Sequence, residues 1–223
     1  AHPARRYDYW LGGKDNFAAD RASGDAIEQV FPHIRTAARE NRRFLHRAVK
    51  HLAAAGIRQF LDIGTGLPTA DNTHQIAQTL DPTARIVYAD NDPLVLVHAR
   101  ALLTSHPHGH TAYVHADLRN PDRLLADPDL AATLDLNQPV GLLLIAVLHF
   151  LPDPAAHTAV HTLVDALPAG SYLALSHATA DLLPAGTAHA LHEEPAAADI
   201  VLRTHTQISA FTTGLDLLPP GIT

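Results

Sequence analysis

The chain has 223 residues, a length that favours one domain or one domain with an appended segment. Its formal net charge of −7 argues against general binding to nucleic acid, and no run approaches the roughly 18 apolar residues of a membrane span. The absence of cysteine excludes disulfides, cysteine nucleophiles and cysteine-ligated zinc. No signal peptide opens the chain, so a cytoplasmic protein is expected. Because the net charge disfavours nucleic acid, a small-molecule substrate is expected.

The first expected unit is an N-terminal arm or lid over residues 1–35. Apolar residues show little periodicity in its first two thirds, so an irregular segment is expected there. Residues 7–17 read Tyr-Asp-Tyr-Trp-Leu-Gly-Gly-Lys-Asp-Asn-Phe, and the glycine pair permits a tight turn. We expect this arm to close over a ligand, with Tyr9, Trp10 or Phe17 excluding water. Alternatively, these aromatic side chains pack on the edge of a sheet.

The second expected unit spans residues 36–223 and begins with an amphipathic helix at 36–54, where Phe44, Ala48 and Leu52 recur at i, i+4 and i+8. Apolar runs then alternate with helical stretches. Strands are expected at 57–63, 85–90, 111–116, 140–147 and 171–177, and helices at 71–80, 93–104, 121–127 and 155–167. This alternation predicts an α/β fold with a doubly wound, mostly parallel sheet and helices on both faces. Weaker signals favour helices at 186–198 and 204–213 and a late strand at 215–218.

A glycine turn follows the first expected strand, in the segment Phe60-Leu61-Asp62-Ile63-Gly64-Thr65-Gly66. Glycine adopts positive φ readily and lets a ligand lie against the backbone. An acid two residues before the first glycine suits a ligand that is cationic or rich in amines and hydroxyls, because it would repel a bare phosphate. This pattern favours S-adenosylmethionine over a pyrophosphate cofactor.

Acidic residues and a histidine mark the ends of four expected strands. In open α/β sheets, ligands bind beyond the carboxyl ends of the strands, so these side chains are expected to share one edge. They are Asp62, Asp90, Asp117 and His149.

The second and third of these acids have spacings that suit a nucleoside. Asp90 lies 24 residues beyond Gly66, close to the offset at which an acid accepts hydrogen bonds from a ribose diol. Asp117 can accept from an exocyclic adenine amine, while Leu118 can pack on the base or offer its backbone N–H. The alternative for each acid is a structural cap of the following helix or turn.

These features together resemble a class I S-adenosylmethionine-dependent methyltransferase. More narrowly, residues 2 to about 180 are similar to an actinobacterial S-adenosyl methyltransferase family, formerly a domain of unknown function. The motifs that carry this resemblance are the 7–17 segment, Asn41-Arg42-x-Phe44-Leu45, Leu61-Asp62-Ile63-Gly64-Thr65-Gly66-x-Pro68-Thr69, Asn91-Asp92-Pro93 and Leu175-Ser176-His177-Ala178.

The resemblance implies S-adenosylmethionine as cofactor, S-adenosylhomocysteine as product, and a set of cofactor contacts. Within that set, the glycine turn would cradle the methionine moiety, Asn91 would face the adenine, and Lys14 would meet the cofactor carboxylate. The full set is Tyr9, Lys14, Asn16, Arg42, Asp62, Gly64, Thr65, Gly66, Pro68, Asp90, Asn91, Asp117, Leu118, Ala146 and His149. The class ends in a hairpin whose last strand inserts into the sheet, and that strand is expected to be missing here.

One departure from the general class concerns the turn itself. Pro68 stands where the class has a third glycine, so the next helix is expected to begin later, near residues 69–71.

Histidines are abundant, 17 in all, and one is the expected general base. His149 follows the fourth strand, where a neutral imidazole can deprotonate a hydroxyl or amine as the methyl group arrives. His177 is a weaker candidate, and His74 is expected near the cofactor. The tract at 106–110 is expected to be a polar turn and not a metal site, because it has no nearby carboxylate or cysteine.

The expected reaction is methyl transfer to oxygen or nitrogen of a small molecule. Two alternatives stay open: an NAD(P)-dependent oxidoreductase and a non-catalytic protein that binds S-adenosylmethionine. Against the oxidoreductase stand Asp62, Pro68 and the lack of a clear Tyr-Lys catalytic pair.

Overall fold

The computed structural model describes residues 1–69, 71–102 and 104–223. Within these ranges, five strands form one all-parallel sheet in the order β3-β2-β1-β4-β5. Their bounds are β1 Gln59–Ile63, β2 Arg85–Asp90, β3 His110–His115, β4 Gly141–Ile145 and β5 Tyr172–Ser176. The strand order reverses between β1 and β4, which confirms the doubly wound α/β fold expected from the sequence.

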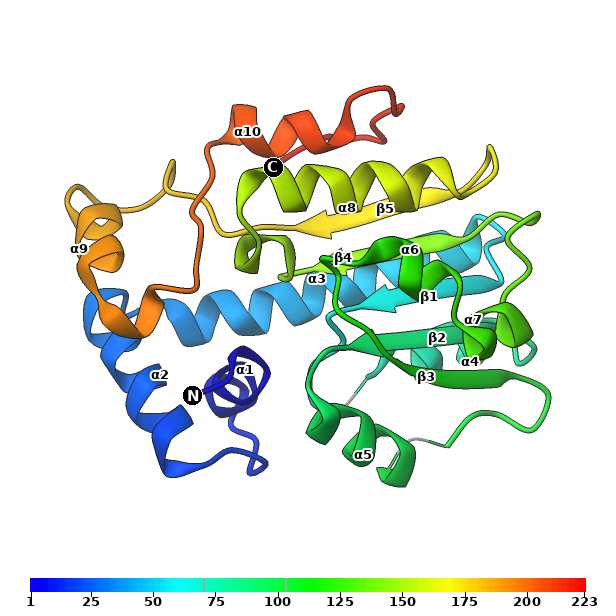
Figure 1. Ribbon diagram of the computed structural model, residues 1–223, viewed down its shortest axis with the longest axis horizontal. Coiled ribbons are helices and arrows are strands. Elements are labelled where there is room, and N and C mark those ends of the chain that lie inside the picture. The colour runs from blue at the N-terminus through cyan, green and yellow to red at the C-terminus, as the bar shows by residue number, and fades with distance from the viewer. Residues whose placement is uncertain (70, 103) are drawn as a thin grey trace.

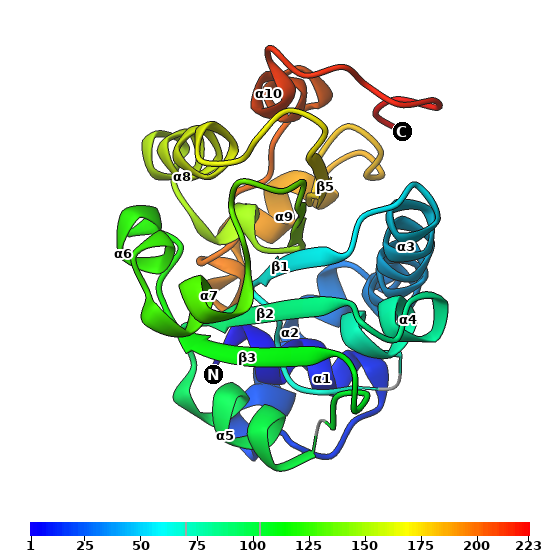
Figure 2. The same cartoon turned by 90° about the vertical axis from the view of Figure 1, so that its right-hand side faces the viewer.

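Helices lie on both faces of this sheet (Figure 2). One face is covered by α3 and α4, and the other by α6, α7 and α8, while α5 lies near β3 at the sheet's edge (Figure 2). The helices are α1 Pro3–Leu11, α2 Ala18–Val30, α3 Ile34–Ala54, α4 Thr73–Leu80, α5 Pro93–Leu102, α6 Pro121–Leu125, α7 Pro128–Thr133, α8 Asp153–Asp165, α9 Thr187–Glu193 and α10 His205–Ser209. The described part of the chain also forms the short 3₁₀ helices η1 Leu148–Phe150, η2 Pro195–Ala197 and η3 Ala210–Thr212.

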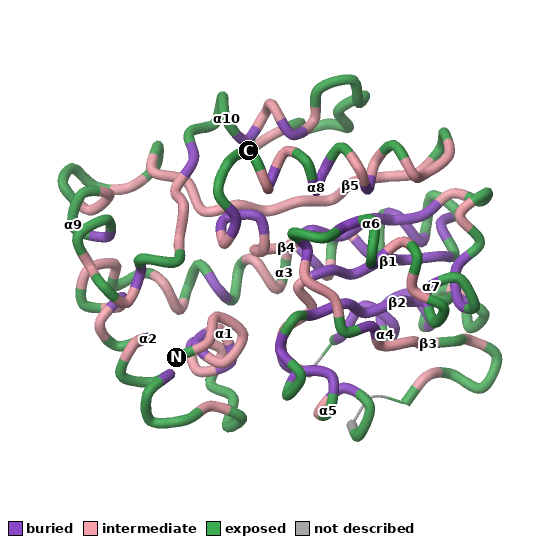
Figure 3. The backbone as a smooth tube through the Cα atoms, viewed as in Figure 1, coloured by how far each residue is buried: buried purple, intermediate pink, exposed green. Residues whose placement is uncertain are grey.

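The central strands are buried on both faces, as Figure 3 shows. Phe60 and Leu143 pack in a core with α3 and α4, whereas their sequence neighbours Leu61 and Leu142 pack in a second core with α8. Successive side chains of a strand point to opposite faces, so a strand covered on both sides reads as a continuous apolar run. This is why the strands are legible in the sequence.

The N-terminal segment differs from expectation. Residues 1–23 were expected to be irregular, but they form α1 and the first part of α2, which pack on α9 and η2 around Trp10 and Ile27. The helical signal is hidden because α1 buries charged side chains, Arg6 and Asp8, whose partners a local pattern does not reveal. Figure 1 shows α1, α2 and α9 together beyond the carboxyl ends of the strands.

Other differences concern boundaries and the tail. The stretch at 186–198 divides into α9 and η2, and 204–213 into α10 and η3. The helix α7 was not expected at all. The expected late strand at 215–218 is wrong: Leu217 and Leu218 are exposed in a loop, and the two prolines that follow lack the N–H groups of a sheet ladder.

Two expectations lie partly outside the described residues. The helix expected at 93–104 is seen as α5, and residue 103 is not described. The helix after the glycine turn begins at Thr73, with Asn72 as its N-cap, later than residues 69–71, of which residue 70 is not described. Among the described residues, no helix combines the length and the apolar character needed to cross a membrane.

Candidate active site

A cavity of about 540 Å³ lies at the carboxyl edge of the sheet, where the strand order reverses. Its wall brings together segments far apart in the chain: α1, α3, the turns after β1, β2, β3 and β4, the end of β5, and the segment after η2. All four residues expected at the strand ends line it: Asp62, Asp90, Asp117 and His149.

The glycine turn after β1 forms the floor of this cavity. Gly64 has φ +73°, and a Cβ built there would lie 2.5 Å from the Val147 side chain, so this position requires glycine. Gly66 has φ +67°, and a Cβ there would meet nothing within 4 Å, because the position faces open space. Thr65 Oγ1 donates to the backbone oxygen of Asp62 (3.0 Å), which closes the turn. A ligand can therefore lie directly against this backbone.

Asp62, in β1, is nearly inaccessible to solvent. Its carboxylate accepts a hydrogen bond from Thr73 Oγ1 (2.6 Å) at the start of α4. Burial raises its pKa to about 6, with Asp90 adding to the rise, while Thr73 and the Arg42 guanidinium oppose it. A cationic ligand beside Asp62 would stabilise the charged form of this buried carboxylate.

Asp90, at the end of β2, holds the same turn. Its carboxylate accepts from the backbone N–H of Gly66 (2.9 Å) and of Asp92 (2.9 Å). Burial raises its pKa, although both hydrogen bonds oppose the rise. A carboxylate has about four lone-pair sites, so Asp90 retains capacity to accept from a diol.

The third strand contributes a half-buried Asp117 and a buried Leu118, and both line the cavity with the exposed Asn91. Asp117 also caps its own turn by accepting from Arg119 N (2.9 Å). Ala146 directly follows the fourth strand, and its φ of +54° is unusual for a residue with a side chain. Its N–H donates to Ser176 Oγ (3.0 Å) and ties β4 to β5.

Helix α3 presents Asn41 and Arg42 to the cavity. Asn41 bridges two other wall residues: its Nδ2 donates to Tyr7 Oη (2.9 Å), and its Oδ1 accepts from Ser176 Oγ (2.6 Å). Arg42 donates to the backbone oxygen of Asp71 (3.0 Å), and its charge acts on Asp62. Asn41 thereby links α1, α3 and β5 around the cavity.

A histidine pair forms the far part of the wall. The rings of His149 and His177 meet edge to face, with centroids 5.5 Å apart. Arg203 holds His177 and the backbone on either side of His149: its guanidinium donates to His177 Nε2 (2.6 Å) and to the backbone oxygens of Leu148 (3.0 Å) and Leu151 (2.8 Å). Burial lowers the pKa of His149 to about 3 and that of His177 to about 4, so both imidazoles are neutral at physiological pH.

Several of the expected contacts lie outside the residues that line the cavity: Tyr9, Lys14, Asn16 and Pro68. For Lys14 and Asn16 the reason lies in Asp8, which is buried and accepts from Asn16 Nδ2 (2.8 Å) and Asp15 N (3.1 Å). It thereby folds the glycine turn of residues 12–16 away from the cavity and leaves Lys14 exposed. Of the aromatic residues in the arm, Tyr7 and Trp10 line the cavity, whereas Phe17 is 60% exposed.

The structure also places His74 and the histidine tract at 106–110, for which the sequence analysis gave expectations. His74 is buried against Tyr88, whose hydroxyl lies 2.8 Å from its Nδ1, and it is not among the lining residues. The tract at 106–110 forms a turn closed by the N–H of Gly109 and the oxygen of His106 (2.9 Å). Within the described part of the chain, no group of three or more candidate ligands is placed to hold a metal ion.

The wall residues that sequence reasoning missed are Arg6, Tyr7, Ser176 and Asp199. Arg203, which contacts the wall residue His177 but does not itself line the cavity, was missed as well. Arg6 is buried and its Nη2 contacts both carboxylate oxygens of Asp199 (2.8 and 2.7 Å). For Ser176 the sequence contained a signal, because the residue lies in a motif that carries the family resemblance, although no role was assigned to it. Arg6 and Asp199 gave none, because these two ion-pair partners lie 193 positions apart.

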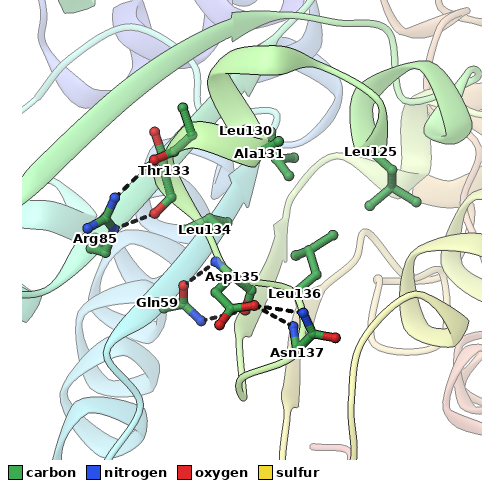
Figure 4. A pocket seen from close by; sticks show the side chains of 11 residues that line it. Gln59, Arg85, Leu125, Leu130, Ala131, Thr133, Leu134, Asp135, Leu136 and Asn137 are labelled. Atoms are coloured by element: carbon green, nitrogen blue, oxygen red, sulfur yellow. Dashed lines mark hydrogen bonds between the residues drawn. The ribbon is translucent and has the colours of Figure 1, made fainter.

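A second hollow, of about 620 Å³, lies at the opposite, amino-terminal edge of the sheet (Figure 4). Its polar groups fasten the connection between α7 and β4. Gln59 Nε2 donates to the backbone oxygen of Asp135 (3.0 Å) and its Oε1 accepts from Asp135 N (2.7 Å), while Arg85 donates to the backbone oxygens of Ala132 and Thr133. These contacts give the hollow a structural role, and the candidate active site is the cavity at the carboxyl edge.

Comparisons with known proteins agree with this geometry. A family model described as S-adenosyl methyltransferase matches residues 1–223. A solved structure of a DUF574 family protein from Streptomyces avermitilis is 48% identical, covers 99% of this chain and 86% of its own, and superposes with a TM-score of 0.94. A methyltransferase candidate from Thermobifida fusca is 41% identical over 98% of this chain and 82% of its own, with a TM-score of 0.89.

More distant structures share the fold. The plantazolicin methyltransferase BpumL, solved with S-adenosylhomocysteine, is 12% identical over 94% of this chain and 73% of its own, with a TM-score of 0.51. No curated protein matches the sequence. The family match and both close structures support a methyltransferase and give no support to the oxidoreductase alternative. The chain therefore belongs to the S-adenosyl methyltransferase family, and S-adenosylmethionine is its methyl donor.

Proposed function

We propose that the chain transfers a methyl group from S-adenosylmethionine to an oxygen or nitrogen atom of a small molecule. The observation that carries this proposal is the cavity at the carboxyl edge, which joins the glycine turn and the carboxylates of Asp62, Asp90 and Asp117 to a wall of neutral histidines and aromatic rings. Its volume of about 540 Å³ lies in the range typical of small-molecule sites.

The residues present fit the cofactor. S-adenosylmethionine supplies an activated methyl group on a sulfonium when it is bound. The turn at Gly64 and Gly66 leaves backbone accessible, and the two buried carboxylates beside it suit a ligand with positive charge and hydroxyl groups. We assign Asp62 and the glycine turn to the methionine moiety, Asp90 to the ribose, and Asp117 with Leu118 to the adenine.

We assign to Arg42 the contact with the cofactor carboxylate that the sequence analysis assigned to Lys14. It lines the cavity beside Asp62, whereas Lys14 is exposed outside it. A guanidinium forms bidentate hydrogen bonds with carboxylates, so Arg42 suits the carboxylate of the cofactor. Tyr7 and Trp10 of α1 cover this space and would exclude water from it, which favours a positioned reaction.

Calorimetric titration tests the cofactor assignment. We expect heat with S-adenosylmethionine and with S-adenosylhomocysteine, and none with NADH; heat with NADH alone would overturn the proposal. A screen of small molecules for release of S-adenosylhomocysteine then separates an enzyme from a non-catalytic binding protein.

The ribose assignment has its own test in Asp90→Asn, which keeps the size of the side chain and one acceptor oxygen. We expect S-adenosylmethionine to bind more weakly by about 1–3 kcal/mol, because a charged acceptor of two hydroxyl groups is lost. The exposed Asp129→Asn on α7 serves as the control. Unchanged affinity would show that Asp90 only holds the turn.

A further inference from the structure

The tautomer of His149 is set by a backbone group. Its Nδ1 accepts a hydrogen bond from the N–H of Ala178 (3.4 Å), and a neutral imidazole that accepts at Nδ1 carries its proton on Nε2. Nε2 has no hydrogen-bond partner among the described residues, and the ring lines the cavity. His149 therefore offers a ligand an N–H donor, and its basic nitrogen is occupied.

The neighbouring His177 offers no base either. Its Nδ1 lies 2.7 Å from the backbone oxygen of Ala178, an acceptor only, so this nitrogen carries the proton. Its Nε2 accepts from Arg203 Nη1 (2.6 Å). Both ring nitrogens are thus used within the protein, and neither imidazole of the His149–His177 pair has a free lone pair for the proton of an acceptor.

The electrostatic surroundings of His149 are positive. The guanidinium groups of Arg6 and Arg203 both act on its ring and help burial to keep it neutral. Both are almost fully buried, whereas the carboxylates that partner them, Asp199 and Asp153, are 39% and 54% exposed. Asp199 lines the cavity, but both of its oxygens are bound to Arg6, whereas the exposed Asp153 that partners Arg203 is not among the lining residues. With these carboxylates engaged, the Nε2–H donor and the two buried guanidinium groups make the cavity beside His149 suited to an anion.

We propose that the methyl acceptor presents an oxygen that is already anionic, a carboxylate or a phenolate, and that His149 Nε2–H donates a hydrogen bond to it. This inference rests on the proposed methyltransferase function and replaces the general-base role expected from the sequence. A lone pair of the oxygen forms the new O–C bond while the S–C bond breaks and its electron pair stays on sulfur. The anion and the sulfonium give a neutral ester or ether and a neutral thioether, so no proton has to be removed.

Binding of matched probes to the complex with S-adenosylhomocysteine tests the charge preference without turnover. Benzoate is compared with benzamide, and ionised 4-nitrophenol with 4-nitroanisole, by calorimetry. We expect at least one anion to bind about tenfold or more tightly than its neutral partner, because charge-assisted hydrogen bonds are roughly twice as strong as neutral ones. The pair that shows the difference identifies carboxylate or phenolate as the acceptor class.

Substitutions at His149 distinguish a donor from a base. His149→Gln places an amide N–H near the position of Nε2 but cannot take a proton, whereas His149→Phe removes the donor. We expect the preferred anion to bind His149→Gln within about threefold of wild type and His149→Phe about tenfold or more weakly. The exposed His161→Gln on α8 is the matched control and should bind like wild type.

Nitrogen-15 NMR of histidine-labelled protein reads the tautomer directly, with His149→Gln used to assign the signal. We expect a neutral ring protonated at Nε2 from pH 5 to pH 8. Equal binding of neutral and anionic probes, or a ring protonated at Nδ1, would overturn the inference while leaving the proposed function intact. Failure of S-adenosylhomocysteine to bind wild type would instead overturn the proposed function.

Discussion

At the scale of one residue, the buried carboxylate of Asp62 lowers the stability of the fold when it is charged. Its pKa is raised from 3.8 to about 6, mainly by burial, so the native state holds a proton that the unfolded state has already released between these pH values. Where the native state binds more protons, stability falls as pH rises. A difference of this size corresponds to about 3 kcal/mol lost between pH 4 and pH 6.

We therefore expect Asp62→Asn to raise the free energy of unfolding of the ligand-free protein at pH 8 by about 1–3 kcal/mol, measured by urea denaturation. The neutral amide can still accept from Thr73 Oγ1, so the hydrogen bond to α4 is kept. The same variant should bind S-adenosylmethionine more weakly, because it lacks the negative charge. Asp129→Asn should shift stability by less than about 0.5 kcal/mol. Lower stability in Asp62→Asn would contradict this account.

The pH dependence of cofactor affinity follows from the same carboxylate. Below its pKa of about 6 Asp62 is increasingly protonated, and it no longer attracts a cation. Calorimetry should show that affinity for S-adenosylmethionine falls as pH is lowered from 7 to 5, and that this fall is absent in Asp62→Asn. A fall of equal size in the variant would assign the effect to another group.

At the scale of the element, α1 acts as the cover of the cavity. It is fastened to the sheet side through Arg5, whose guanidinium contacts Asp92 (2.7 Å) and Asp20 (3.0 Å). Asp92 in turn donates its backbone N–H to Asp90, the carboxylate assigned to the ribose. The fastening of α1 thus lies next to the cofactor site.

Arg5→Gln should loosen this cover. We expect stopped-flow measurements to give a dissociation rate of S-adenosylhomocysteine raised about tenfold or more with a smaller change in the association rate, because both ion pairs of Arg5 are lost and two buried carboxylates lose this cation. Arg43→Gln, which removes an exposed ion pair with Glu40, is the matched control. An unchanged dissociation rate in Arg5→Gln would show that α1 is fixed by its other contacts.

The same element shows the limit of prediction from sequence. The strands could be predicted because a strand covered on both faces is a continuous apolar run. The acidic residues that lie in or close behind the ends of these runs, Asp62, Asp90 and Asp117, could be predicted with them. The helix α1 could not, since it buries Arg6 against Asp199, nearly two hundred positions away. Lys14 was expected in the site because its charge suits the cofactor carboxylate, whereas the hydrogen bond between Asn16 and Asp8 holds the loop that contains Lys14 outside the cavity.

At the scale of the molecule, the cavity is shared between the arm of residues 1–35 and the remainder of the chain, a division that stays a prediction. Tyr7 belongs to the arm, yet its hydroxyl is held by Asn41 and donates to Ala38, both in α3. A ligand that contacts both parts stabilises the assembled state by mass action, by about 2.7 kcal/mol at a concentration one hundred times its Kd.

Hydrogen exchange measured by mass spectrometry can show where this stabilisation acts. With saturating S-adenosylhomocysteine, we expect slower exchange in α1, in the glycine turn after β1 and in η1, because these elements form the wall of one cavity. The connection between α7 and β4 should exchange as in the free protein, since it borders the hollow at the opposite edge. If exchange in α1 were unaffected while the glycine turn was protected, the arm would be an independent unit and would not cover the cofactor. Protection at the α7–β4 connection instead would move the binding site to the other edge of the sheet.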